Sequence, residues 1–139
     1  MGTLYYLQMF DEEASYENYR QAFGIGLFSS RQLAEDTAKR YLAKVTGFKD
    51  YPVTYQIEEK RVPGAGGDLP SFVFLVSGWN ENDDLDEIDV IESDCYRTEK
   101  EAERALEALK SACPRQHWCI NRWTIDQCNW QEGFDRYTY

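Results

Sequence analysis

Two apolar runs that lie 68 positions apart predict the first strand of each half of the chain. Leu4 to Phe10 and Phe72 to Trp79 are rich in the aromatic and branched residues that favour strands. A polar stretch follows each run, and then a second apolar segment, near Ala22 to Phe28 and near Ile88 to Tyr96. The pattern predicts two successive strands in each half.

Each pair of strands is followed by a predicted helix. Ser30 and Thr98 stand where a hydroxyl side chain would cap it, and Glu101 extends the second cap to a capping box. Apolar residues then recur at helical spacing. They are Leu33, Ala34, Thr37, Ala38, Tyr41, Leu42 and Val45 in the first half, and Ala102, Ala105, Leu106, Leu109 and Cys113 in the second. Gly47 and Pro114 are the predicted stops.

A third strand completes each half. Val53, Tyr55 and Ile57 alternate with polar residues in the first half, and Ile120 to Ile125 occupies the same place in the second. Gly24 and Gly26 interrupt the second strand of the first half, which predicts a bulge or bend there.

An ungapped shift of 68 residues pairs apolar with apolar positions, which indicates an internal repeat. We expect a single domain over 1–139, with repeat one at 1–62, a linker rich in Gly and Pro at 63–70, repeat two at 71–130 and an aromatic tail at 131–139. The predicted fold class is α+β. Its duplicated β-β-α-β unit has pseudo-twofold symmetry, with about six strands in one mixed or antiparallel sheet and two helices on one face.

Repeat one resembles an uncharacterised family of small bacterial domains of unknown function that has the same strand-strand-helix-strand order. The residues that carry the resemblance are Phe28-Ser29-Ser30, Ala34, Gly47-Phe48, Tyr55 and Ile57. The resemblance covers about one repeat and implies a fold without an activity, because the family brings no catalytic residues. Repeat two departs from it, with Arg115 and Gln116 in place of Gly47 and Phe48.

The charge balance narrows the range of partners. The chain has 139 residues, 25 acidic and 15 basic, with a formal net charge of -10. Attraction to phosphate needs clustered Lys and Arg, so we expect no direct binding to nucleic acid or to anionic membranes. A basic protein partner fits this charge. No apolar run approaches the roughly 18 residues that span a bilayer, and the first residues lack a signal-peptide pattern. We expect a cytoplasmic monomer or homodimer.

Candidate chemistry is sparse. Four soft ligands, Cys113, His117, Cys119 and Cys128, match no common zinc spacing, so neither a metal nor another cofactor is expected. The repeat alignment assigns Cys95, Cys113 and Trp123 to the core, and it leaves His117 in the turn before the last strand. Glu35 and Glu103, at matched helix positions, read as exposed residues. No catalytic residue is predicted.

The most unusual segment is acidic and is predicted to bind a partner. Its residues are Trp79, Glu81, Asp83, Asp84, Asp86, Glu87 and Asp89. The carboxylates could meet Lys and Arg while the indole fills a pocket on the partner. The alternative is a solvated connection between two strands. Repeat one has a milder counterpart, expected to be a polar loop, in Asp11, Glu12, Glu13, Tyr16, Glu17 and Tyr19.

The aromatic residues near the end of the chain form a second candidate surface. They are Trp118, Trp123, Trp130, Phe134, Tyr137 and Tyr139. Trp123 is assigned to the core, whereas Trp130, Phe134 and the tail either cap the core or dock on a partner, and we favour the cap.

These features favour a non-catalytic acidic binding protein, in the form of a small bacterial inhibitor or immunity-type protein with a basic protein target. One alternative is a regulatory domain that binds a small molecule in a cleft between the repeats. An enzyme that uses carboxylates is the third interpretation.

Overall fold

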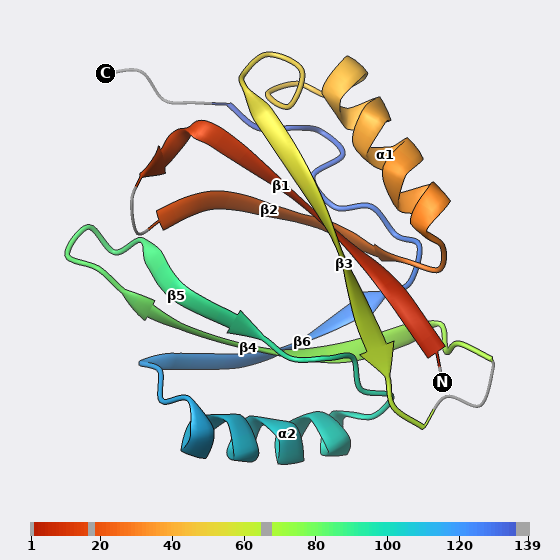
Figure 1. Cartoon of the computed structure of the whole chain (residues 1–139), viewed down its shortest axis with the longest axis vertical. Helices are drawn as coiled ribbons and strands as arrows, with labels where there is room; N and C mark the ends of the chain where they lie inside the picture. Colours follow the sequence, from red (N-terminus) through yellow and green to blue (C-terminus); the bar gives the residue numbers. More distant parts are fainter. Residues whose placement is uncertain (1, 17–18, 65–67, 136–139) are drawn as a thin grey trace. The chain divides into compact units, whose positions relative to one another are not determined.

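The computed structural model describes residues 2–16, 19–64 and 68–135, and the fold over them is α+β (Figure 1). The elements found in these residues are β1 (Gly2–Tyr16), β2 (Tyr19–Phe28), α1 (Arg31–Lys44), β3 (Val53–Val62), β4 (Phe72–Glu81), β5 (Glu87–Glu92), α2 (Glu99–Ala112) and β6 (His117–Thr124). The predicted order of two strands, a helix and a strand thus occurs twice.

The six strands in the described residues form two three-stranded sheets, ordered β2-β1-β3 and β5-β4-β6. The prediction of one six-stranded sheet with both helices on one face is therefore wrong. In each half the first strand is central and pairs antiparallel with the second, which the chain reaches through a short connection. The third strand of each half pairs with the other side of the first strand. The three strands of each half therefore form a separate sheet.

The chain divides into two compact units, and the boundaries of these units differ from those of the predicted repeats. One, here called the first-repeat unit, contains Leu4–Glu59 and the segment that begins at Asp126. The other, the second-repeat unit, contains Lys60–Ile125 and the first residues of the chain. The first-repeat unit therefore holds α1, β2 and most of β1 and β3, and the second-repeat unit holds α2 with β4, β5 and β6.

Both helices begin at the predicted caps. The Leu33 N–H donates to Ser30 Oγ at 3.1 Å, and the Glu101 N–H donates to Thr98 Oγ1 at 3.2 Å. In the second cap the Thr98 hydroxyl also donates to the Glu101 carboxylate, at 3.2 Å. These bonds satisfy backbone donors that the first helical turn leaves without partners.

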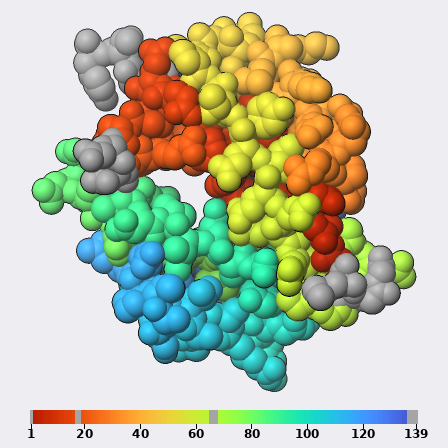
Figure 2. Space-filling model, in the orientation of Figure 1, coloured from red at the N-terminus to blue at the C-terminus, as the bar shows by residue number. Residues whose placement is uncertain are grey.

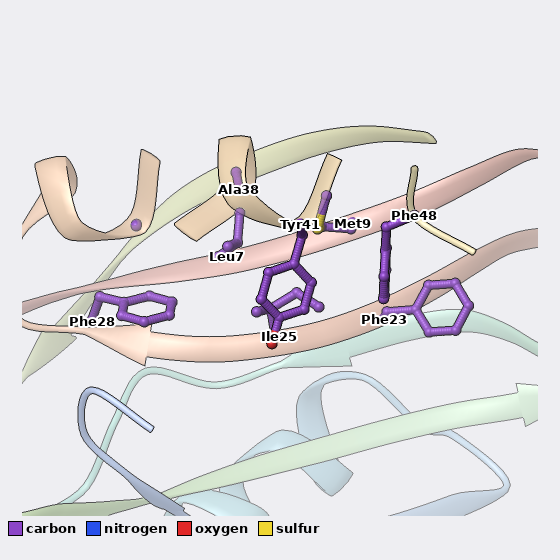
Figure 3. Packing of buried hydrophobic residues seen from close by; sticks show 9 residues of the cluster. Leu7, Met9, Phe23, Ile25, Phe28, Ala38, Tyr41 and Phe48 are labelled. Atoms are coloured by element: carbon purple, nitrogen blue, oxygen red, sulfur yellow. The ribbon is translucent and has the colours of Figure 1, made fainter. Parts of the chain in front are cut away.

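The core of the first-repeat unit lies between its sheet and α1 (Figure 3). Its buried residues alternate along the strands and recur at helical spacing on α1, as the hydrophobic pattern predicts. They are Leu7, Met9, Phe23, Ile25, Phe28, Ala34, Ala38, Tyr41 and Phe48. In the second-repeat unit α2 contacts β4 and β6, and Ala102 and Cys95 are fully buried. The assignment of Cys95 to the core is confirmed, whereas Trp123 is only partly buried.

Two local predictions for repeat one have different outcomes. The pairing of Leu7 with Gly26 and of Gln8 with Gly24 leaves Ile25 as an extra residue, so the predicted bulge is confirmed. The predicted polar loop is wrong for residues 11–16, which continue β1. Glu12 explains the longer strand, because its carboxylate accepts bonds from Arg20 on β2 and from Thr54 on β3. Glu17 lies outside the described residues.

Residues 126–135, here called the strap, complete the first-repeat unit. The Asp126 and Asn129 N–H groups donate to the carbonyls of Leu27 and Ile25 on β2, at 2.9 and 2.7 Å. Phe134 packs against the core. The prediction that the tail caps the core is confirmed for Phe134, while Tyr137 and Tyr139 lie outside the described residues.

Neither helix within the described residues has both the length and the apolar character of a membrane span.

Candidate functional site

The acidic segment between β4 and β5 forms an ordered turn. Asn82 Oδ1 accepts bonds from the N–H groups of Asp84 and Asp86, both at 3.0 Å. The backbone of Asn82 also donates to the Asp86 carbonyl at 3.1 Å and accepts from the Leu85 N–H at 3.0 Å. This is the way in which an Asn side chain replaces backbone partners in a tight turn. Asn82 therefore holds the segment that carries the carboxylates.

The tip of the turn carries an apolar side chain. Leu85 is 74% exposed and has a φ of 65°, in the left-handed region that non-glycine residues rarely adopt. Asp83 and Asp84 precede it and are also exposed. This part of the chain is green in Figure 2 and lies at the molecular surface. We call residues 79–90 the acidic hairpin.

Trp79 and His117 lie side by side at the base of the acidic hairpin. They are opposite each other in the register of β4 and β6, and their rings stack with centroids 5.6 Å apart at 26°. His117 Nε2 is 3.1 Å from Glu81 Oε1. Since the imidazole covers one face of the indole, only the rest of the Trp79 side chain is open to a partner.

Glu81 and Glu87 face each other across β4 and β5. Like charges directly opposite on a sheet repel. The ring of His117 reaches the Glu81 carboxylate and gives it a polar partner on the β6 side. The loop before β6 adds support, since Gln116 Oε1 accepts from the Glu81 N–H at 2.8 Å and the Gln116 N–H donates to Asn80 Oδ1 at 2.9 Å.

Asp89 is held by Asn80 and Arg115. Its carboxylate accepts from Asn80 Nδ2 at 3.1 Å, and its backbone carbonyl accepts from Arg115 Nε at 2.6 Å. Asp89 has a φ of 52° within a strand whose pairing is irregular here. Val90 beside it is 50% exposed. Arg115 therefore fixes the β5 side of the acidic hairpin and brings a positive charge to it.

All seven predicted site residues belong to this one hairpin, but their surroundings differ. Trp79 and Glu81 are joined by His117, Glu87 lies opposite Glu81, and Asp89 is tied to Asn80. Asp83, Asp84 and Asp86 stand on the turn that Asn82 organises. Sequence reasoning missed His117, Asn82 and Arg115. The pattern Asn82-Asp83-Asp84 was the available signal for the turn, whereas nothing in the sequence points to the strand register.

The environment of Cys119 makes it a poor nucleophile. Burial raises the pKa of its thiol above the ordinary value, and the Glu87 and Glu92 carboxylates raise this pKa further. A bond from Asn121 to the sulfur, at 3.3 Å, has the opposite effect. Because the thiolate is the reactive form, this site lowers reactivity.

Across residues 2–16, 19–64 and 68–135, no three or more His, Cys, Asp or Glu side chains are arranged to hold a metal ion. The sulfur atoms of Cys95, Cys113, Cys119 and Cys128 are not joined in disulfides. Glu35 on α1 and Glu103 on α2 belong to different compact units. Glu103 is exposed and Glu35 is half-buried.

Comparisons with known proteins do not place the chain in a family. No family model matches it, and no curated protein or solved structure is significantly similar to it.

Proposed function

We propose that this is a non-catalytic binding protein that docks the acidic hairpin on a basic surface of a partner protein. The observation that carries the proposal is the ordered turn, in which Asn82 holds the backbone that carries the exposed residues Asp83, Asp84 and Leu85. A fixed turn loses little conformational entropy on binding, which favours affinity.

The carboxylates of the acidic hairpin differ in how available they are to a partner protein. Glu81 and Asp89 already have polar partners, in His117 and Asn80. Asp83 and Asp84 are exposed, and within the described residues neither carboxylate lies at ion-pair distance from a cation. Two such carboxylates beside an apolar side chain suit a surface that carries Lys or Arg around a shallow apolar depression.

An inhibitory or immunity-type role is the specific form that we propose. A net charge of -10 would place carboxylates where a basic target holds phosphate groups, for example at the nucleic-acid site of a nuclease. We also propose that the two halves of the chain are copies of one β-β-α-β unit. The matching strand order of the two sheets, with the first strand of each half at the centre, supports this proposal.

The test uses fluorescein-labelled decalysine as the basic probe and measures binding by fluorescence anisotropy at low and moderate NaCl. The variant Asp83→Asn/Asp84→Asn removes two charges from the turn and leaves its backbone bonds to Asn82 in place. Exposed ion pairs contribute about 0.2–1 kcal/mol each, so we expect binding to weaken by about 2-fold to 30-fold. Salt should weaken binding of the wild type more than that of the variant.

The matched control is Glu103→Gln/Glu107→Gln, which removes the same charge from the exposed side of α2. We expect this control to bind decalysine nearly as the wild type does. If both variants lose affinity equally, only total charge matters and the acidic hairpin is not the binding surface. Retention of affinity by the hairpin variant would lead to the same conclusion.

A further inference from the structure

The strap fills a binding site formed by β2, α1 and the residues around Gly47. β2 is an edge strand of its sheet, and its Ile25 and Leu27 carbonyls accept bonds from the strap backbone at 2.7 and 2.9 Å. The Tyr41 hydroxyl on α1 donates to the Asn129 carbonyl at 2.7 Å. The strap is the blue segment that follows β6 in Figure 1. Backbone bonds of this kind are typical of peptides that add to a sheet edge.

An aromatic slot receives the far end of the strap. The Phe134 ring stacks on Phe23 with centroids 4.5 Å apart and meets Phe48 edge-on at 5.0 Å. The Phe134 N–H donates to the Thr46 carbonyl at 3.1 Å. A Cβ on Gly47 would lie 2.4 Å from the Phe134 carbonyl oxygen, so the slot exists because residue 47 has no side chain.

A second close approach lies near the start of the strap. A Cβ on Gly26 would come within 2.6 Å of the Gln127 carbonyl oxygen. The site is thus shaped around the strap near both of its ends, at Gly26 and at Gly47.

The connection that leads into the strap is short and left-handed. The Ile125 N–H donates to the Ser71 carbonyl, whereas the next N–H, that of Asp126, donates to Leu27. Asp126 has a φ of 64°, and its carboxylate accepts bonds from the N–H and hydroxyl of Ser29, both at 2.8 Å. A hinge without spare residues that holds a left-handed non-glycine residue is the kind that favours exchange of a segment between copies.

We propose that β2 and the aromatic slot also bind residues 126–135 of a second copy of this chain, which gives a dimer with exchanged straps. The exchanged strap makes the same contacts as the strap of its own chain, and only the hinge changes. The extended hinge relieves the left-handed conformation of Asp126, and the balance between the two forms depends on protein concentration. This proposal does not depend on the proposed function.

The test refolds the full-length protein from denaturant over a range of concentrations and measures its mass by light scattering after gel filtration. We expect a dimer that becomes more abundant with concentration. Phe134→Ala weakens the strap and Gly47→Ala blocks the slot, so each variant alone should lose the dimer. Gly64→Ala is the matched control for Gly47→Ala. Both glycines have a φ of 80° or more, but no atom of the described residues lies within 4 Å of a Cβ on Gly64.

Mixing the two defective variants distinguishes exchange from other kinds of association. When tagged Phe134→Ala is refolded with untagged Gly47→Ala, the intact strap of one chain meets the intact slot of the other, and we expect a heterodimer on the tag resin. Insertion of Gly-Gly between Ile125 and Asp126 should remove the dimer and leave the circular dichroism unchanged. A wild type that stays monomeric at every concentration overturns the proposal. The proposal is also overturned if Phe134→Ala alone or Gly47→Ala alone forms as much dimer as the wild type.

Discussion

Tyr41 shows how one side chain ties several parts of the first-repeat unit together. Its ring belongs to the buried core on α1, and its hydroxyl donates to the strap at Asn129. The hydrophobic pattern predicts the buried ring, because position 41 falls on the apolar face of the helix. It does not predict the hydroxyl partner, which lies 88 positions away in the sequence. The sequence pattern therefore predicts the burial of Tyr41 but not its connection to the strap.

We expect Tyr41→Phe to change the response to alkaline pH. Burial raises the pKa of Tyr41 from 10.0 to about 12, and the neighbouring Cys128 adds to the shift. The folded pKa lies above the unfolded value. The stability that Tyr41 contributes is therefore fully present below pH 10.0 and is lost as the pH rises toward 12. Urea unfolding measured across this range should show a smaller loss of stability in the variant.

At neutral pH the same variant reports the hydrogen bond to Asn129. Loss of one buried bond should lower the free energy of unfolding by about 1 kcal/mol. Tyr16→Phe is the comparison, since the Tyr16 side chain is half exposed. Equal alkaline profiles for the wild type and Tyr41→Phe would contradict the role given to this hydroxyl.

At the scale of elements, the sequence predicts what depends on neighbours in the chain and misses what depends on distant pairing. Both helices begin at the predicted caps, because a cap needs only residues three positions apart. The partition into two sheets was not predicted, since strand runs do not encode which edges pair. The stacking of His117 on Trp79 was missed for the same reason, because it follows from the register of β4 and β6.

The caps give a direct test of this local control. Ser30→Ala and Thr98→Ala each remove the side-chain acceptor of one helix, and each should cost about 1 kcal/mol of stability in guanidinium unfolding. Ser30→Asp and Thr98→Ser keep an acceptor and should restore most of the loss. If the alanine variants are as stable as the wild type, the caps contribute nothing beyond what water supplies.

For the whole molecule, the charge of -10 predicts a response to salt. Carboxylates outnumber cations, so self-repulsion destabilises the folded state, and screening should relieve it. The Debye length falls from about 30 Å at 0.01 M to about 10 Å at 0.1 M ionic strength, and we expect the melting temperature to rise over this range. Circular dichroism melts would measure the rise, which should be smaller in Asp83→Asn/Asp84→Asn. A fall would mean that exposed pairs such as Arg20–Glu12 outweigh the repulsion.

In the candidate site, too, the sequence predicts what depends on neighbouring residues and misses what depends on distant pairing. The excess of carboxylates and their position between two strands could be predicted, because composition and hydrophobic pattern determine both. The side chains that hold the acidic hairpin could not be predicted, because His117 and Arg115 lie near the other end of the second-repeat unit's sequence.

The strap also sets an order of events during synthesis on the ribosome. The second-repeat unit draws almost entirely on one continuous stretch, Lys60–Ile125, whereas the first-repeat unit needs residues from Asp126 onward to cover Phe23 and β2. Domains usually fold in the order in which they emerge from the ribosome. Here the half that is translated first must wait for the last described residues, so the half that is translated second is the first that can finish folding.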